Sequence, residues 1–432
     1  MAGFDKIKLS KQLLRSVADL GYTNPKEIQQ KTLNRIIGGQ DVIAIGPEGS
    51  GKTTTYVLST LNRFNYAPEG VPKVLILVPE KEDVLSTIEK FESLNKNRSI
   101  SITGLYVTPG FESQMDALAE GADIVVATPD RARAIYLKLG LNLNKIEVFI
   151  VDDADRMLKK GLQLPMTELA NSISKAQRLV FTDVLHSRLE NLLEPFLNNP
   201  AIIEVDELEE SDLPTHHQLL YKVPNFLTKQ NLLNLFLQDE EVFTKSVVFI
   251  NNKATAEQVY RSLHRRIHDA VGCLNPPFFD MNGYKSVAEF KANAEARVMI
   301  VVTENNDDVD LSGIPFLIHF DIPQDTETYI KRVTNTNGDD ETIALTFAID
   351  MELSLVKQIE HVTGNKMEPS ALPEDLVIVN DPKLRTEPIK QSTKNAEPEI
   401  GAAFHEKKAS NNKNYNYSAG EKAKMNKKKK HG

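Results

Sequence analysis

Short runs of apolar residues alternate with helical patterns through the first half of the chain. The apolar runs span residues 41–45, 74–79, 100–107, 123–128, 148–152, 179–181 and 202–205, and helical patterns span residues 10–20, 26–37, 81–94 and 188–197. Strands that are apolar at nearly every position are buried on both faces, so the pattern predicts a parallel sheet covered by helices on each side. In such sheets, ligands bind at the carboxyl ends of the strands.

The same pattern restarts after an acidic connector, Asp206–Asp212. Apolar runs recur at residues 217–223, 246–251, 298–303, 316–320 and 343–347, with helical patterns at 227–237 and 254–267. We therefore expect an α/β fold with two parallel-sheet domains in tandem. The predicted boundaries are 1–205 for the first domain, 206–214 for the linker, 215–380 for the second domain and 381–432 for a tail.

Composition narrows the class of protein. Hydrophobic residues make up 41% of the chain and charged residues 26%, as in soluble globular proteins. No apolar run is long enough to span a membrane, and the first residues lack the apolar segment of a signal peptide. The single cysteine, Cys273, excludes a disulfide framework within the chain. These features lead us to expect a cytoplasmic protein that does not bind membranes.

Charge is distributed unevenly along the chain. The net charge is −9, yet the segment from Lys383 onward holds 13 Lys or Arg against 5 Asp or Glu. That segment is too polar to bury a core, and we expect it to be disordered. It would either solubilise the protein or bind a polyanion, with Tyr415 and Tyr417 available to stack on bases.

The strongest chemical signal is the stretch DVIAIGPEGSGKTTTY, residues 41–56. It places GxxxxGK[ST] between a strand and a helix, which is the setting of a phosphate-binding loop. Lys52 is expected to reach the β- and γ-phosphates, and the Thr53 hydroxyl to hold Mg²⁺. A plain glycine turn would need neither the lysine nor the hydroxyl. The other expected phosphate-binding residues are Gly46, Gly49, Ser50, Gly51 and Thr54.

Two further segments flank this loop. Gly21-Tyr-Thr-Asn-Pro-Lys-Glu-Ile-Gln29 precedes it, and Val151-Asp-Asp-Ala-Asp155 follows a strand, with Asp152 lying 100 residues after Lys52. Together these segments resemble the DEAD-box RNA helicase family of superfamily 2, and the resemblance covers residues 4–353. It implies RecA-like domains, ATP and Mg²⁺ as cofactors, and RNA as the partner.

The resemblance assigns roles in the first domain. Gln29 would read adenine, since an amide offers both a donor and an acceptor; Tyr22 would contact the nucleotide and Phe4 would stack on the base. Asp152 would hold Mg²⁺ through water. Asp153 stands where the family has a glutamate that orients the attacking water, so the two catalytic positions are Asp152 and Asp153. Because nucleophile placement is sensitive to about an ångström, the shorter carboxylate predicts slower hydrolysis.

The segments that contact RNA and couple it to ATP are partly retained. Thr128-Pro-Asp-Arg131 resembles TPGR, and Pro79–Val84 resembles PTRELA with Lys81 in place of arginine. Thr128, Arg131 and Lys81 are thus expected to bind RNA, although both cations would equally suit solvated helix starts. Thr182-Asp-Val184 stands for the coupling segment SAT and keeps only its first hydroxyl.

The second domain departs further from the family pattern. Asp310 is the candidate ribose contact, and Arg332 aligns with the first arginine of YxHRxGRTGR. Asn335 and Gly338 replace the next two arginines, which stabilise charge during phosphoryl transfer. Lys331 and Arg332 would either compensate or form an exposed charged face.

Three functions remain open from the sequence. The first is a DEAD-box-like, ATP-dependent RNA helicase or remodelling protein with weak hydrolysis. The second is a catalytically inactive pseudohelicase that acts as a nucleotide-dependent RNA-binding or scaffold protein. The third is a phosphate-loop ATPase that acts on a protein or DNA partner, which the segment around Gln29 disfavours.

Overall fold

The computed structural model describes residues 3–64, 70–97, 99–108, 110–206, 213–305, 309–335 and 342–379. The tail with Tyr415 and Tyr417, most of the acidic connector, and Gly338 lie outside the described residues.

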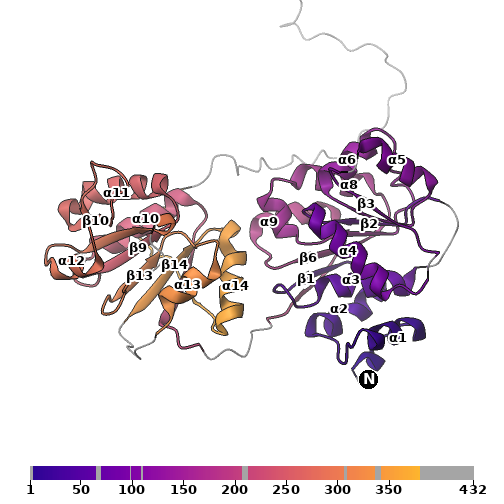
Figure 1. The fold of residues 1–432 in the computed structure, drawn as a ribbon, viewed down its shortest axis with the longest axis horizontal. Helices are drawn as coiled ribbons and strands as arrows, with labels where there is room; N and C mark the ends of the chain where they lie inside the picture. The colour runs from indigo at the N-terminus through magenta and orange to yellow at the C-terminus, as the bar shows by residue number, and fades with distance from the viewer. Residues whose placement is uncertain are drawn as a thin grey trace, which may run out of the picture. The chain divides into compact units, whose positions relative to one another are not determined.

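The first part of the chain forms a seven-stranded sheet in the order β3-β4-β2-β5-β6-β1-β7, with every neighbouring pair parallel. Figure 1 shows β1, β2, β3 and β6 of this sheet with helices around them. Its strands are β1 Val42–Ile45, β2 Val74–Leu77, β3 Ile102–Leu105, β4 Ile124–Ala127, β5 Val148–Val151, β6 Gln177–Thr182 and β7 Ala201–Glu204. Its α-helices are α1 Lys11–Asp19, α2 Glu27–Ile37, α3 Lys52–Arg63, α4 Lys81–Leu94, α5 Phe111–Glu120, α6 Pro129–Leu137, α7 Ala154–Lys159, α8 Gln163–Ser172 and α9 Ser187–Leu193. Short 3₁₀ turns lie at Phe4–Lys6 and Glu194–Phe196.

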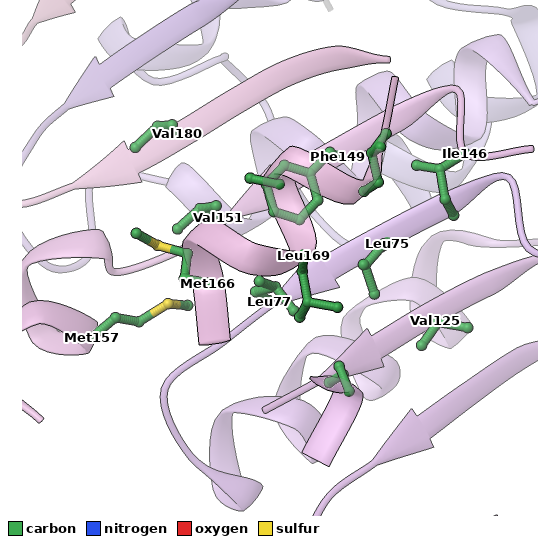
Figure 2. Packing of buried hydrophobic residues seen from close by; sticks show 14 of the residues in the cluster. Leu75, Leu77, Val125, Ile146, Phe149, Val151, Met157, Met166, Leu169 and Val180 are labelled. Atoms are coloured by element: carbon green, nitrogen blue, oxygen red, sulfur yellow. The ribbon is translucent and has the colours of Figure 1, made fainter. Parts of the chain in front are cut away.

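Alternate residues of the inner strands β1, β2, β4 and β5 enter two separate hydrophobic clusters. Phe149 and Val151 pack into one cluster, and Val148 and Ile150 into the other. Successive strand residues point to opposite faces of a sheet, so both faces of this sheet are covered. Figure 2 shows the first cluster, in which Phe149 lies with Leu169 and Met166 of α8. This double burial is why β1, β2, β4 and β5 are apolar at every position.

The second part of the chain forms an eight-stranded sheet in the order β11-β10-β12-β9-β13-β14-β8-β15, again with parallel pairs only. Its strands are β8 His217–Lys222, β9 Ser246–Ile250, β10 Val271–Leu274, β11 Gly283–Tyr284, β12 Val298–Val302, β13 Phe316–His319, β14 Ile343–Ala348 and β15 Glu368–Ser370. Its α-helices are α10 Phe226–Gln238, α11 Lys253–Ile267, α12 Val287–Ala292, α13 Thr326–Val333 and α14 Leu353–Thr363. Short 3₁₀ turns lie at His268–Ala270, Thr303–Asn305 and Asp350–Glu352.

This sheet too has a hydrophobic cluster on each face, with Val248 and Ile250 in one and Val247 and Phe249 in the other. The two parallel sheets in tandem confirm the expected α/β fold class. The strands β10, β11 and β15 were not predicted. β10 contains a glycine, β11 has two residues, and β15 reads Glu-Pro-Ser, so none of them gives a continuous apolar run.

Candidate functional site

The glycine-rich loop between β1 and α3 is tightly folded. Gly49 and Gly51 have φ angles of 82° and 96°, in the left-handed region that favours glycine. A Cβ at Gly51 would lie 2.8 Å from Nε2 of Gln29. Ser50 is buried, and its Oγ has no hydrogen-bond partner among the described residues. The loop therefore has the glycine cradle and the unused hydroxyl that suit a bound phosphate.

Lys52 begins α3 and is buried beneath this loop. Its ammonium donates to the carbonyl oxygens of Gly46 at 2.7 Å and Pro47 at 3.2 Å, and it forms an ion pair with Asp183. Burial by itself lowers the pKa of Lys52, but the adjacent Asp183 carboxylate outweighs it and the pKa is raised. Lys52 is thus a stable cation whose three donor hydrogens all have acceptors.

Thr53 and Asp152 meet at the ends of neighbouring elements. The Thr53 hydroxyl donates to Oδ2 of Asp152 over 3.4 Å. Burial, with the charge of Asp153 as a second cause, raises the pKa of Asp152 to about 7. Within the described ranges, no group of three or more His, Cys, Asp or Glu is arranged to hold a metal. Mg²⁺ needs only one or two protein ligands when water and phosphate complete its shell, so this pair fits that ion.

Asp153 caps α7 with φ of 49°. Its Oδ2 accepts from Nη1 of Arg156 at 2.7 Å. The same guanidinium also contacts Glu80 at 3.2 Å and Asp83 at 3.4 Å. The carboxylate expected to orient water is therefore held by a neighbouring cation, an arrangement that we did not predict.

Gln29 is in the first turn of α2, and its side chain lies against Gly51 of the phosphate loop. Its Oε1 accepts from the backbone N–H of Lys26 at 2.9 Å at the start of α2, and the Lys26 ammonium donates to the carbonyl oxygen of Gly49. Lys26 replaces the family's threonine, so this departure adds a contact to the loop. Tyr22 accepts from Nζ of Lys90 at 2.8 Å.

These residues share one hollow at the carboxyl end of the first sheet. Its lining includes Tyr22, Lys26, Gln29, Glu48, Gly49, Gly51, Lys52, Thr53, Thr54, Asp153, Arg156 and Asp183. Phe4 is different: it is buried in the hydrophobic core and lines a separate small hollow with Leu14, although Tyr22 borders both. The structure thus brings the expected nucleotide residues of the first domain together, with Phe4 set apart.

Thr182 connects the end of β6 to the acidic segment. Its buried hydroxyl lies 2.9 Å from Oδ1 of Asp155 and 2.9 Å from the carbonyl oxygen of Val184, both acceptors. The next residue is Asp183, whose contact with Lys52 the sequence reading missed. β6 pairs with both β1 and β5, so the segments that follow these three strands are neighbours. That strand order is the signal that would have revealed the contact.

The three expected RNA-binding residues lie along one connected edge. The Lys81 ammonium is 5.7 Å from the ring centre of Tyr106, and the Arg131 guanidinium is 4.7 Å from that of Phe111. Gln114 joins the two groups, because it accepts from Nε of Arg131 at 2.7 Å and donates to the carbonyl oxygen of Tyr106 at 2.8 Å. Thr128 is the N-cap residue of α6. Tyr106, Phe111 and Gln114 were not predicted to belong to this edge.

In the second sheet, Arg332 is buried rather than exposed. Its Nη2 donates to Oγ1 of Thr303 at 3.2 Å, and its guanidinium lies 4.2 Å from the ring centre of Phe249. The alternative that Lys331 and Arg332 form one exposed face is therefore wrong for Arg332. The reason is that stacking on an aromatic ring stabilises a buried guanidinium. Lys331 is exposed.

The remaining candidates of the second sheet have contacts of their own. Asn335 is buried, and its backbone N–H donates to the carbonyl oxygen of Pro214 at 2.8 Å. Asp310 is exposed and accepts from Oγ of Ser312 at 2.7 Å and from Nζ of Lys291 at 3.3 Å. These contacts lower the pKa of Asp310. The ribose contact expected for Asp310 stays a prediction.

The fold and the loop define a phosphate-loop protein built on parallel sheets. Residues 26–192 match the family model described as "DEAD/DEAH box helicase". The chain is 26% identical over 387 residues to "ATP-dependent RNA helicase RhlB" of Pseudomonas putida, covering 87% of this chain and 96% of that protein. It is 27% identical over 375 residues to "RNA helicase CrhR" of Synechocystis sp., covering 86% of this chain and 74% of that one.

Among solved structures, the chain is similar to a DEAD box protein from Methanococcus jannaschii, with 20% identity, a TM-score of 0.47, and coverage of 85% of this chain and 99% of that chain. The sequence matches agree with the motifs described above. The chain is therefore similar to DEAD/DEAH box helicases, with the family model matching residues 26–192 of the first domain.

Proposed function

We propose that this protein is an ATP-dependent, RNA-binding member of the DEAD-box family in which hydrolysis is weak. The observation that carries the proposal is the convergence of Gln29, Lys52, Thr53 and Asp153 on one hollow, with Asp152 bonded to Thr53. This set offers an amide for the base, a cation for phosphate, and a hydroxyl with a carboxylate for Mg²⁺.

The residues of the first domain have separate tasks in this proposal. Gln29 orients adenine against the phosphate loop, which it already contacts at Gly51. Lys52 and the backbone N–H groups of the loop bind phosphate oxygens, while Thr53 and Asp152 hold the metal. When bound, Mg²⁺ neutralises phosphate charge. Binding clamps the two domains over single-stranded RNA and displaces a paired strand.

Weak hydrolysis follows from three contacts or replacements. Asp153 is one methylene shorter than the family's glutamate and is paired with Arg156. Asn335 stands where the family has an arginine, so it brings no charge to the γ-phosphate. Arginines of this kind contribute about 10³–10⁵ to turnover. We therefore expect this protein to hydrolyse bound ATP slowly.

The proposal is tested by ATP turnover with and without single-stranded RNA, next to a Lys52→Ala variant. We expect slow turnover that RNA stimulates and that is lost in the variant. ATP binding without turnover under any RNA would instead establish the inactive pseudohelicase. That second candidate is favoured by the Asp183–Lys52 ion pair, which opposes the arrival of phosphate.

RNA binding needs its own test. Lys81→Ala and Arg131→Ala should each weaken binding of single-stranded RNA about three- to tenfold and reduce its salt dependence, since each removes one phosphate contact. Lys175→Ala is the matched control. Lys175 is exposed just before β6, at the amino ends of the strands, whereas Lys81 and Arg131 follow the carboxyl ends of β2 and β4. Equal losses in all three variants would indicate general charge attraction and would argue against this edge.

A membrane role receives no support from the helices. In the parts of the chain that the structure describes, no helix combines the length and the apolar character needed to cross a bilayer.

A further inference from the structure

The ion pair between Lys52 and Asp183 lies inside the nucleotide hollow. Asp183 follows β6, which pairs with β1 on one side and β5 on the other. Its side chain is 10% exposed and that of Lys52 is 8% exposed. Asp183 therefore stands between the phosphate loop and the acidic segment, where both strand ends face the same space.

A carboxylate at this position occupies the space next to the Lys52 ammonium that a phosphate oxygen would take. The remaining acceptors of the Lys52 ammonium are the carbonyl oxygens of Gly46 and Pro47, the first two residues of the loop. Asp183 provides the anionic acceptor, and two oxygens on one carbon resemble two oxygens of a phosphate in charge and spacing. A phosphate that approaches Lys52 must move this carboxylate aside or accept its repulsion.

Other carboxylates surround this lysine. Asp152 and Asp153 act electrostatically on Lys52, and the nearby Arg156 is already shared by Asp153, Glu80 and Asp83. Lys26 and Lys90 also line the hollow, but Lys26 donates to the carbonyl oxygen of Gly49 and Lys90 to the hydroxyl of Tyr22. Each charge that the ligand adds at this end of the hollow is placed among carboxylates. A triphosphate adds its extra charge at the position nearest to Lys52, since this lysine reaches the β- and γ-phosphates.

We propose that Asp183 is a specificity-determining residue that competes internally for the phosphate position and makes the site favour a nucleoside diphosphate over a triphosphate. This inference rests on the proposed nucleotide site, and it adds which nucleotide that site holds at rest. It also assigns different roles to two consecutive residues. Thr182 binds Asp155, whereas Asp183 competes with a phosphate for Lys52.

The test is a titration of ADP and of a non-hydrolysable ATP analogue, each with Mg²⁺, into the full chain and into Asp183→Asn. The asparagine keeps the shape and removes the charge. We expect the analogue to bind about tenfold more tightly to the variant and ADP about threefold more tightly, because one negative charge near the ligand is gone. Asp183→Ala should shift both affinities in the same direction, which guards against misfolding of one variant.

Glu120→Gln is the matched control. Glu120 is exposed at the end of α5 and does not line the hollow, so its neutralisation should change either affinity by less than about twofold. Lys52→Ala should weaken both ligands in either background.

The outcomes separate the two proposals. If the wild type binds nucleotides through Lys52 but Asp183→Asn leaves the ratio of analogue to ADP affinity unchanged, the inference fails and the nucleotide site stands. If the wild type binds ADP but not the analogue, and Asp183→Asn binds both, the inference is supported in its strongest form. If no variant binds either nucleotide, both proposals fall.

Discussion

The two sheets of this protein share an architecture and differ in how they use their charged residues. In the first sheet, Lys52, Asp153 and Asp183 all line one hollow. In the second sheet, Arg332 is stacked on Phe249 and bonded to Thr303. The match to the family model also ends within the first sheet, at residue 192.

This difference separates ligand binding from catalysis. A phosphate loop stabilises the bound ground state, whereas arginines that act on the developing charge are needed only in the transition state. In the proposed function, the first domain provides the former, and Asn335 and Gly338 stand in the second domain in place of the latter. A protein of this kind is expected to respond to nucleotide binding more than to turnover.

The largest expected effect is a gain of ATP turnover from substitutions in the second domain. Such a gain would remove the difference between the two domains. Replacing Asn335 and Gly338 together with arginine should raise RNA-stimulated ATP turnover about a hundredfold or more, because guanidinium groups stabilise the transferring phosphoryl group. Asn335 borders a hollow lined also by Asp310 and Lys331, which leaves space for a longer side chain. Steady-state kinetics with saturating RNA measures the effect.

A matched pair of lysines at the same two positions serves as the control and should give a smaller gain, since lysine lacks the planar fork. No increase with either pair would show that the first domain itself limits hydrolysis.

A second prediction concerns the hydrogen bond that anchors the coupling segment. Thr182→Val keeps the side-chain volume but leaves the buried Asp155 carboxylate without the hydroxyl donor 2.9 Å away. We expect the free energy of unfolding of the first domain to fall by about 2 kcal/mol. Chemical denaturation followed by circular dichroism measures it.

Thr182→Ser retains the hydroxyl and should recover most of the loss. If the valine variant is as stable as the wild type, the bond contributes nothing and the segment is free to move.

A smaller effect is expected from lengthening Asp153. Asp153→Glu restores the family's side chain and should raise turnover about tenfold, because the carboxylate can then reach the attacking water. Asp153→Asn, which cannot accept a proton, should abolish turnover. Single-turnover measurements separate this chemical step from product release; a glutamate variant no faster than the wild type would place the limitation elsewhere.

The smallest expected effect is a change in the pH dependence of stability, caused by a histidine in the core of the second sheet. His319 is fully buried between the rings of Phe249 and Tyr329, and neither ring nitrogen has a hydrogen-bond partner among the described residues. Burial lowers the pKa of His319 well below its ordinary value of 6.5, with Arg332 as a second cause. The histidine is therefore neutral in the fold, whereas the unfolded chain takes up a proton below pH 6.5.

Stability from this residue should be complete above pH 6.5 and decline as the pH falls. At pH 5.5, His319→Phe should be less sensitive to acid than the wild type by about 1 kcal/mol, since phenylalanine fits the aromatic stack and cannot bind a proton. Denaturant titrations at pH 5.5 and 7.5 provide the comparison. Equal acid sensitivity in both proteins would show that His319 is not the group responsible.

Most of the fold could be predicted from the sequence because its strands are buried on both sides. Continuous apolar runs located β1, β2, β4 and β5 to within two residues, and the phosphate loop indicated which edge binds a ligand. The short strands β10, β11 and β15 lack such runs and became visible only through their pairing.

The site was less predictable where a contact depends on strand order. Asp183 meets Lys52 because β6 lies beside β1, and a single sequence does not state that order. The burial of Arg332 was missed for a different reason. A charged residue is normally assigned to the surface, and only the ring of Phe249 in a neighbouring strand reveals why this one is inside.

The close approach of Gln29 to Gly51 links the proposed base-binding and phosphate-binding parts of the site. The amide that would read the base lies against the glycine that precedes α3, with 2.8 Å between Nε2 and a hypothetical Cβ. Any side chain added at Gly51 would push the base reader away. A single substitution at Gly51 would therefore disturb both the amide proposed to contact the base and the loop proposed to bind phosphate.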